Sequence, residues 1–253
     1  MKATITERPI LFSAPMIMAL LAGAKTQTRR AVTPSRSLVD GRGVRAWPFL
    51  DFDGTEWVDQ GPSPAGNPGP YLKVANVDGE RRHRVYPRYQ VGELRWVQET
   101  HAFEACEGPD GSDADRVLYR ATETDPPEGI RWRPSIFMPR WASRITLRVT
   151  SVRVERVQDI SDEDARAEGV KPWGPSQRGV YGMTLENVGP VYPAPAADII
   201  AGGESWTTSA ARSFRGLWVS INGAESWEAN PFVWVVGFER VESAVLAQLG
   251  GVR

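Results

Sequence analysis

Three long stretches rich in glycine and proline constrain this chain more than any other feature of its sequence. They cover about residues 31–90, 104–130 and 171–206. Within the first, seven of the ten residues from Gly61 to Pro70 are glycine or proline, a composition that cannot lie inside a helix or strand. Loops this long inside a domain are usually functional. We therefore interpret the stretches as three irregular insertions into a single domain spanning residues 1–253, the first carrying hairpins near Trp57 and Tyr71.

The segments between the insertions predict short strands. Ile145, Leu147 and Val149 alternate with polar residues, which indicates a strand with one buried face. The apolar phase then slips by one residue, to Val152 and Val154, and such a slip is typical of a bulge or sharp bend at the corner of a small barrel. Further strands are predicted within residues 9–12, 91–100 and 231–238, the last being apolar on both faces.

The first predicted helix covers residues 15–22. Ser13 precedes it, and its hydroxyl is of the type that accepts a hydrogen bond from a first-turn amide. Pro15 suits the first turn, where its missing N–H has no cost. Gly23 follows the helix at the position where a left-handed exit residue is needed.

The second predicted helix covers residues 161–169. Ser161 and Asp164 fit a capping box, and Gly169 is the expected exit. Glu168 then lies in the last turn, where the helix dipole disfavours a negative charge and would raise the pKa of its carboxyl. A raised pKa suits a proton donor. The alternative is an exposed glutamate at a helix end, without a role in chemistry.

The third predicted helix begins near Ser209 and ends at Gly223. It carries one apolar stripe, formed by Phe214, Leu217, Trp218 and Ile221. Together these elements predict an α+β protein: one small β-barrel with packed helices, decorated by the insertions.

Composition limits the function classes. The net charge of -1 argues against a general polyanion binder but not against a local basic groove. The single cysteine, Cys106, excludes an internal disulfide and a multi-cysteine zinc site, and two histidines do not make a metal-ligand spacing. We therefore expect no metal and no cofactor. The apolar N-terminal run is interrupted and too short to span a bilayer, so we expect a cytoplasmic protein of a bacterial cell with no membrane partner.

The most reactive-looking segment is the turn after the first helix. Residues 23–30 hold Lys25, the hydroxyls of Thr26 and Thr28, and the guanidinium groups of Arg29 and Arg30. A lysine beside small hydroxyls on a tight turn can serve acyl transfer or anion binding. A solvated basic turn with no chemistry is the alternative.

Arginine and tryptophan interleave along residues 131–141. Such a pattern occurs along nucleic-acid grooves, where aromatic rings stack on bases and arginines meet phosphates. The alternative is that the tryptophans fill the core while the arginine side chains reach outward.

Residues 20–30, with Lys25 and Thr28, resemble the start of ASCH domains, which belong to the PUA-like barrel superfamily. Residues 92–100 resemble the strand that follows in the family, residues 160–169 its helix ending in Glu-Gly, and residues 231–241 its closing strand. The chain as a whole looks like phage and prophage ASCH proteins, and the likeness covers most of it outside the insertions.

The resemblance implies a PUA-like barrel and an amidohydrolase that removes an acyl group from a modified base such as N4-acetylcytidine. In the similar enzymes a lysine, a threonine and a helix glutamate form the catalytic set, which corresponds here to Lys25, Thr28 and Glu168. Glu99 is a rival for the role of the acid. The residues expected to bind substrate are Thr26, Arg29, Arg30, Trp96, Glu99 and Trp173, with one of the two tryptophans stacking on the base.

The expected mechanism uses Thr28 as nucleophile after Lys25 has taken its proton, and this requires a neutral amine at Lys25. Glu168 would protonate the leaving amine, and backbone amides of the turn would hold the oxyanion.

Two other functions fit the same residues. The chain is alternatively a non-catalytic module that binds RNA, another single-stranded nucleic acid or a modified base. The remaining alternative is a phage assembly protein whose insertions bind a partner chain. The sequence predicts no oligomeric state.

Overall fold

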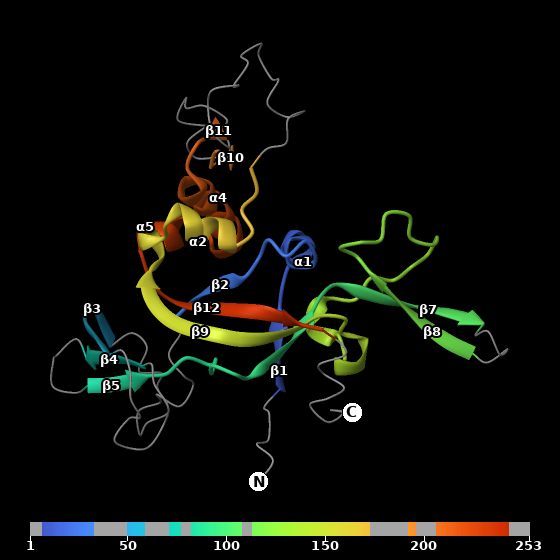
Figure 1. The fold of residues 1–253 in the computed structure, drawn as a ribbon, viewed down its shortest axis with the longest axis horizontal. Helices are drawn as coiled ribbons and strands as arrows, with labels where there is room; N and C mark the ends of the chain where they lie inside the picture. The colour runs from blue at the N-terminus through green and yellow to red at the C-terminus, as the bar shows by residue number, and fades with distance from the viewer. Residues whose placement is uncertain are drawn as a thin grey trace, which may run out of the picture. The chain divides into compact units, whose positions relative to one another are not determined.

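The computed structural model describes residues 7–32, 50–58, 71–76, 82–107, 113–172, 192–195 and 206–242 (Figure 1). This part of the chain is a mixed α+β fold rich in sheet, as the sequence predicts. Its α-helices are α1 (Ala14–Leu21), α2 (Asp162–Ala167), α4 (Ala210–Asn222) and α5 (Ala224–Glu228). None of the helices in these ranges is long and apolar enough to cross a membrane.

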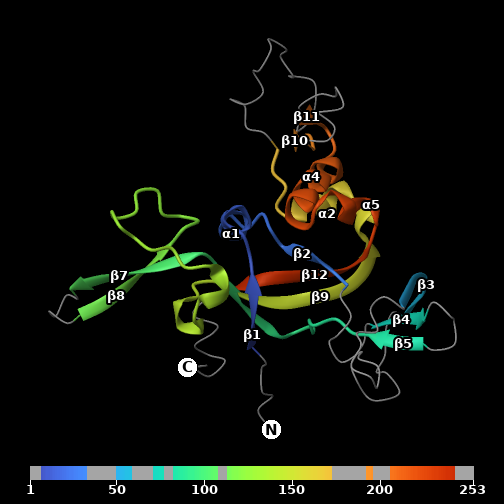
Figure 2. The ribbon, with the colours of Figure 1, turned by 180° about the vertical axis from the view of Figure 1, so that it is seen from behind.

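One five-stranded sheet organises the described residues (Figures 1 and 2). Its order is β1-β6-β9-β12-β2, with β1 parallel to β6, and with antiparallel pairs between β6 and β9 and between β12 and β2. The strands are β1 (Glu7–Leu11), β2 (Gln27–Ala31), β6 (Leu94–Gln98), β9 (Thr146–Arg156) and β12 (Phe232–Val241). Because β1 and β2 lie at its edges, the described strands form no closed barrel, and the predicted barrel is not confirmed.

The first insertion is not irregular throughout. It contains an antiparallel sheet of β3 (Leu50–Val58), β4 (Tyr71–Asn76) and β5 (Arg82–Val85). Within β4, Leu72 and Val74 are fully buried and alternate with Lys73, so the segment has the period of a strand with one buried face. The glycine- and proline-rich run between β3 and β4 lies outside the described residues.

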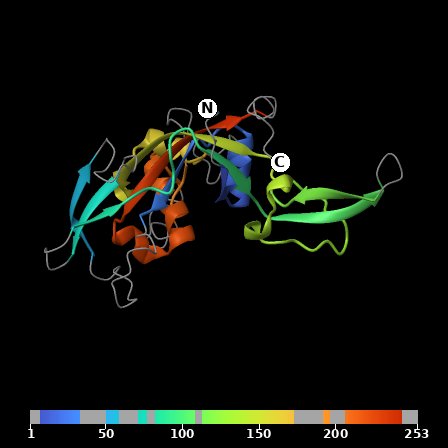
Figure 3. The same cartoon turned by 90° about the horizontal axis from the view of Figure 1, so that it is seen from below.

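The second insertion likewise carries regular structure. Strands β7 (His101–Glu107) and β8 (Asp113–Tyr119) pair side by side as a hairpin (Figure 3). Ala102 and Leu118 face each other in this register and both are buried, which explains why a segment without an obvious apolar run forms a ladder. In the third insertion the described residues include the short strands β10 (Tyr192–Pro193) and β11 (Trp206–Thr207).

The helix ends follow the predicted glycines. Gly23 and Gly169 have φ values of +70° and +93°, which only glycine adopts readily. The Ser161 hydroxyl accepts from the Asp164 amide at 3.1 Å, so the predicted cap of α2 is confirmed. The cap predicted for α1 is wrong in part: Ser13 occupies the N-cap position with extended backbone, but its side chain makes no capping hydrogen bond.

The chain forms two compact units, each built from separate segments. The first comprises residues 1–26, 91–150 and 238–253, and the second comprises residues 27–90 and 151–237. The division within β9 falls between Thr150 and Ser151, where the apolar phase slips. The bulge or bend expected at that point stays a prediction, as does the single domain over residues 1–253.

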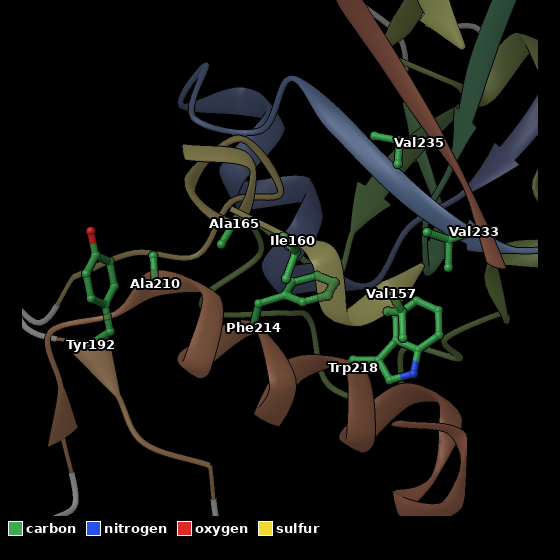
Figure 4. Close-up of a cluster of buried hydrophobic side chains, with 9 residues drawn as sticks. All are labelled: Val157, Ile160, Ala165, Tyr192, Ala210, Phe214, Trp218, Val233 and Val235. Carbon is green, nitrogen blue, oxygen red and sulfur yellow. The ribbon is translucent and has the colours of Figure 1, made fainter. Parts of the chain in front are cut away.

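The core of the second unit lies between α4, α2 and β12 (Figure 4). Phe214 and Trp218 of α4 point into this cluster, and Ile221 does not, since it is 55% exposed. The predicted apolar stripe of α4 therefore ends one turn early. The buried members are Val157, Ile160, Ala165, Tyr192, Ala210, Phe214, Trp218, Val233 and Val235.

The core of the first unit has the predicted alternation. Ile145, Leu147 and Val149 are each no more than 2% exposed, and Leu94 and Val97 of β6 are each 1% exposed. Short 3-10 helices follow the hairpin at η2 (Ser135–Phe137) and η3 (Arg140–Ala142), and η4 (Val157–Asp159) precedes α2 in the second unit.

Candidate functional site

The basic turn after α1 is largely buried. Lys25 and Thr28 are each 2% exposed, Arg29 is 6% exposed, and Thr26 alone among these lies in solvent. A solvated basic turn would expose its long cationic side chains, so that alternative is wrong for Lys25 and Arg29. Glu168 is 3% exposed, and the alternative of an exposed helix-end glutamate is wrong too.

Lys25 belongs to the first unit, where local backbone bonds hold it. The positive φ of Gly23 reverses the chain, and the amides of Ala24 and Lys25 both donate to the Ala19 carbonyl oxygen, at 2.9 and 3.1 Å. The Lys25 amide is therefore occupied and is not one of the predicted oxyanion donors. The Lys25 ammonium lies 5.6 Å from the centroid of the Phe12 ring, a cation–π contact.

The strand β2 in the second unit presents two different faces. Side chains alternate along a strand, so Gln27 and Arg29 share one face and Thr28 has the other. The Gln27 amide nitrogen donates to the Asp164 backbone oxygen at 2.9 Å and to its Oδ1 at 3.0 Å, which identifies the first face as the one that α2 covers. Thr28 lies opposite Val236 in the pairing with β12.

Arg29 is the centre of a buried charge cluster on the face that α2 covers. Its side chain is 1% exposed, and its Nη2 donates to Glu155 Oε2 and to Asp164 Oδ2, both at 2.9 Å. Its Nη1 lies 3.5 Å from Oε1 of Glu168. The guanidinium carbon is 5.9 Å from the centroid of the Phe214 ring. Arg29 thus joins β2, β9, α2 and α4 through one planar group.

A second arginine completes this cluster. Arg153 Nη2 donates to Asp164 Oδ2 at 2.8 Å, and Arg153 Nε donates to Glu155 Oε1. Burial raises the pKa of Asp164, but hydrogen bonds from Gln27 and Arg29 and the charges of both arginines outweigh that effect and hold the pKa below its usual value. The cluster is therefore stable with Asp164 ionised.

Gln27, Glu155 and Asp164 were not among the sequence candidates. The phase of β2 could have suggested Gln27, since it lies two residues before Arg29. The sequence assigned Asp164 to helix capping alone, although the carboxylate of an acid in a first turn can also accept hydrogen bonds from residues of other elements. Nothing in the sequence pairs β9 with this face of β2, so the role of Glu155 needs the fold.

In the first unit Glu99 is held in an ion pair. It is 2% exposed, and Arg144 donates to both of its carboxylate oxygens, at 2.8 and 2.9 Å. The Arg144 guanidinium carbon lies 3.9 Å from the centroid of the Tyr119 ring, and burial raises the pKa of Tyr119. A bidentate pair of this kind fixes a carboxylate, so Glu99 is better explained by structure than as the rival acid.

His101 has one buried nitrogen without a partner. The residue is fully buried, and its Nδ1 lies 3.2 Å from the Glu99 backbone oxygen. Among the described atoms, its Nε2 has no hydrogen-bond partner. Burial lowers the pKa of His101, which keeps the ring neutral.

The predicted site residues divide between the units. Lys25, Thr26, Trp96 and Glu99 belong to the first, and Thr28, Arg29, Arg30 and Glu168 to the second. Within the second unit, Arg29 and Glu168 are in contact. Trp96 and Arg30 are half-buried, and Trp173 lies outside the described residues.

In the part of the chain that the structure describes, no group of histidine, cysteine, aspartate and glutamate side chains could hold a metal ion. Comparison with family models, with curated proteins and with solved structures finds no match for this chain.

Proposed function

We propose that this chain is an ASCH-type protein of PUA-like architecture that hydrolyses the exocyclic amide of an acylated nucleobase, such as N4-acetylcytidine, in the bacterial cytoplasm. One observation carries the proposal: Lys25, Thr28 and Glu168, which the resemblance picks out, are each no more than 3% exposed. Glu168 is paired with Arg29, which accounts for its burial, so the feature that suits acyl transfer is a lysine that is 2% exposed and lies three residues before an equally buried hydroxyl.

In the proposed reaction Lys25, three residues before Thr28, accepts the Thr28 hydroxyl proton. Thr28 Oγ then forms a bond to the acyl carbon. The carbon–nitrogen bond of the amide breaks, and the leaving amine takes its proton from the Lys25 ammonium. Glu168 is not the donor in this step, because it contacts Arg29 on the face of β2 opposite Thr28. Water then cleaves the acyl ester: Lys25 takes a proton from the water as its oxygen bonds to the acyl carbon, and passes it to Thr28 Oγ as the ester bond breaks, which releases the acid and restores both groups. This scheme requires that the amine of Lys25 is neutral before the first step.

Arg29 is a positioning residue in this proposal. Both of its terminal nitrogens contact carboxylates inside the second unit, so it has little to offer a substrate phosphate, and these contacts tie β2 to β9 and to α2. The neighbouring ion pairs with Asp164 and Glu155 fix Arg29 in turn. Arg29 thus fixes β2, and with it the position of Thr28 on the opposite face of the strand.

The experiment measures cytidine released from N4-acetylcytidine. The Lys25→Ala and Thr28→Ala variants are expected to lose about 100-fold or more in kcat/KM, since each removes a group from the reacting set. Lys171→Ala and Thr208→Ala are matched controls with exposed side chains, and they should retain the parent rate. Turnover in the Lys25 and Thr28 variants at the parent rate, or no release by the parent protein, would contradict the proposal.

A second candidate function is nucleic-acid binding without turnover. The exposure of Trp141, at 65%, favours it, because a tryptophan that fills a core is not exposed to this degree. Measured RNA affinity with a salt dependence, in a protein that releases no cytidine, would select this function.

A further inference from the structure

The segment after the β7–β8 hairpin presents apolar side chains to solvent. Ile136, Phe137 and Trp141 are 63%, 70% and 65% exposed, and all three come from η2 and η3 in the first unit. Scattered exposed apolar residues are normal, but three large ones within six positions indicate a surface that binds something. The alternative prediction, that the tryptophans of residues 131–141 fill the core, is therefore wrong for Trp141. Trp132 is half-buried.

Of these side chains, Trp141 is part of an ordered stack. The Phe103 and Trp141 rings lie 5.3 Å apart between centroids with an interplanar angle of 24°, so they are stacked. The Arg133 guanidinium carbon is 4.9 Å from the centroid of the Phe103 ring. We call Phe103, Arg133, Trp141 and the exposed Phe137 the arginine–aromatic surface.

The hairpin and its neighbouring segment hold this surface in place. The backbones of His101 and Arg133 form an antiparallel bridge, with the Arg133 amide donating to the His101 oxygen at 2.7 Å. The buried His101 ring packs edge-on against Phe103 at 5.1 Å. Phe103 therefore rests on a fixed support, and little conformational entropy is lost when a planar ligand binds.

The charge of residues 131–144 indicates which kind of ligand the surface can bind. Residues 131–144 contain four arginines and no aspartate or glutamate. Arg140 and Arg144 are paired with Glu7 and Glu99, whereas Arg131 and Arg133 have exposed side chains. A partner for this surface must offer flat apolar faces together with negative charge.

We infer that the arginine–aromatic surface binds single-stranded nucleic acid, with bases stacking on Trp141 and Phe137 and Arg133 meeting the phosphate backbone. Exposed aromatics beside arginines are the usual platform for unpaired bases. The inference deepens the proposed function and rests on it in one respect: it makes the acylated base part of a strand rather than a free nucleoside. The binding itself needs no catalysis.

The test uses the full chain and a fluorescein-labelled, unacylated rC12 oligonucleotide, with fluorescence anisotropy as the readout. The parent is expected to bind with a Kd on the order of 1–100 µM at low salt. Trp141→Ala and Phe137→Ala should each weaken binding by about 5- to 100-fold through lost stacking. Arg133→Ala should weaken it and reduce the slope of log K against log salt by about 0.7.

Ile221→Ala is the matched control, because Ile221 is a 55% exposed apolar residue in the second unit, and it should bind like the parent. Thermal melting checks that each variant is folded. The inference is overturned if the parent does not bind, if the Trp141 and Phe137 variants bind as tightly as the parent, or if a duplex of equal length binds better. Sedimentation that shows a dimer dissolved by Trp141→Ala would also overturn it, in favour of self-association.

The two proposals fail separately. If the parent releases cytidine from the free nucleoside but does not bind rC12, only the arginine–aromatic surface is refuted. If rC12 binding depends on Trp141, and the protein deacetylates neither free N4-acetylcytidine nor an N4-acetylated rC12, the amidohydrolase is refuted and the surface stands.

Discussion

A single buried arginine, Arg29, is the centre of the charge cluster in the second unit. Arg29 meets Glu155, Asp164 and Glu168, which come from β9, from α2 and from the end of α2. Its Nε has no hydrogen-bond partner among the described atoms, so the cluster is not perfectly satisfied. Burying such a group stabilises little in net terms, but removing Arg29 takes a positive charge away from Glu168, whose side chain is 3% exposed, and from Glu155 and Asp164.

Replacing Arg29 by methionine should therefore lower the free energy of unfolding by about 3–5 kcal/mol, a cost typical of broken buried ion pairs. Arg29→Lys should recover part of this loss, since an ammonium keeps the charge but cannot span three carboxylates. Urea denaturation measures both. The control is Arg116→Ala, whose side chain is 62% exposed and pairs with Glu104, and it should change stability by less than about 0.5 kcal/mol. Equal losses for Arg29→Met and Arg116→Ala would show that the cluster is not structural.

His101 makes the stability of the first unit depend on pH. Its pKa lies below the ordinary value of 6.5 because burial disfavours the charged ring. Above pH 6.5 the ring is neutral in both states; as the pH falls below that value the unfolded chain binds the proton first, and stability decreases until the lower folded pKa is reached.

His101→Asn places an amide nitrogen near the position of Nδ1 but cannot titrate. We expect its unfolding free energy to change less between about pH 7.5 and pH 5 than that of the parent, whatever its absolute stability. Denaturation curves at the two pH values give the comparison. A variant whose pH dependence equals that of the parent would assign the effect to other groups.

At the scale of the element, α2 and α4 are joined by one carboxylate. Asp162 Oδ1 accepts from the Ser209 hydroxyl and from the Ala211 amide, both at 2.8 Å. The bond from the Ala211 amide is the main reason that the pKa of Asp162 lies below its usual value. An acid in the first turn of α2 thus also caps the N-terminus of α4, where the helix dipole favours negative charge.

Asp162→Ala should reduce stability by about 1–2 kcal/mol, the usual cost of a lost cap, and Asp162→Asn by less. The contribution of the carboxylate is complete above the ordinary pKa of 3.8 and is lost as the pH falls through the lower folded value. Thermal unfolding near neutral pH tests the magnitude, with Glu163→Ala as the control from the same turn, since Glu163 is exposed. An equal effect of both variants would argue against the cap.

The elements that sequence predicts best are those with local end signals. Gly23, Gly169 and Ser161 each act through neighbours within four residues, and all three were predicted. In the first insertion the sequence predicted hairpins near Trp57 and Tyr71, and both residues lie in paired strands of the structure, β3 and β4. The β7–β8 hairpin of the second insertion was missed, because each strand is stabilised by its partner rather than by a clear alternation of its own. The early end of the apolar stripe on α4 was missed for a similar reason: the periodicity of the helix cannot show that the fold leaves Ile221 exposed.

At the scale of the whole molecule, contacts between residues distant in sequence limit how much of the candidate site could be predicted. The sequence singled out the polar residues of the turn as candidates, because a lysine and hydroxyls on a tight turn are unusual, and their role stays a prediction. It did not predict that Arg29 would be buried among carboxylates, since its partners lie more than a hundred residues away in sequence. Arg29 was expected to bind substrate, and its contacts instead favour a positioning role.

The strand order has a consequence for synthesis. β12 lies between β9 and β2 in the five-stranded sheet, yet it follows both of them in chain order. While the chain emerges from the ribosome, β9 and β2 are made long before the neighbour that separates them, and each waits with an unpaired edge. Such edges are templates for aggregation. Both edges therefore stay open to other chains until β12 has been made and has paired with β9 and β2.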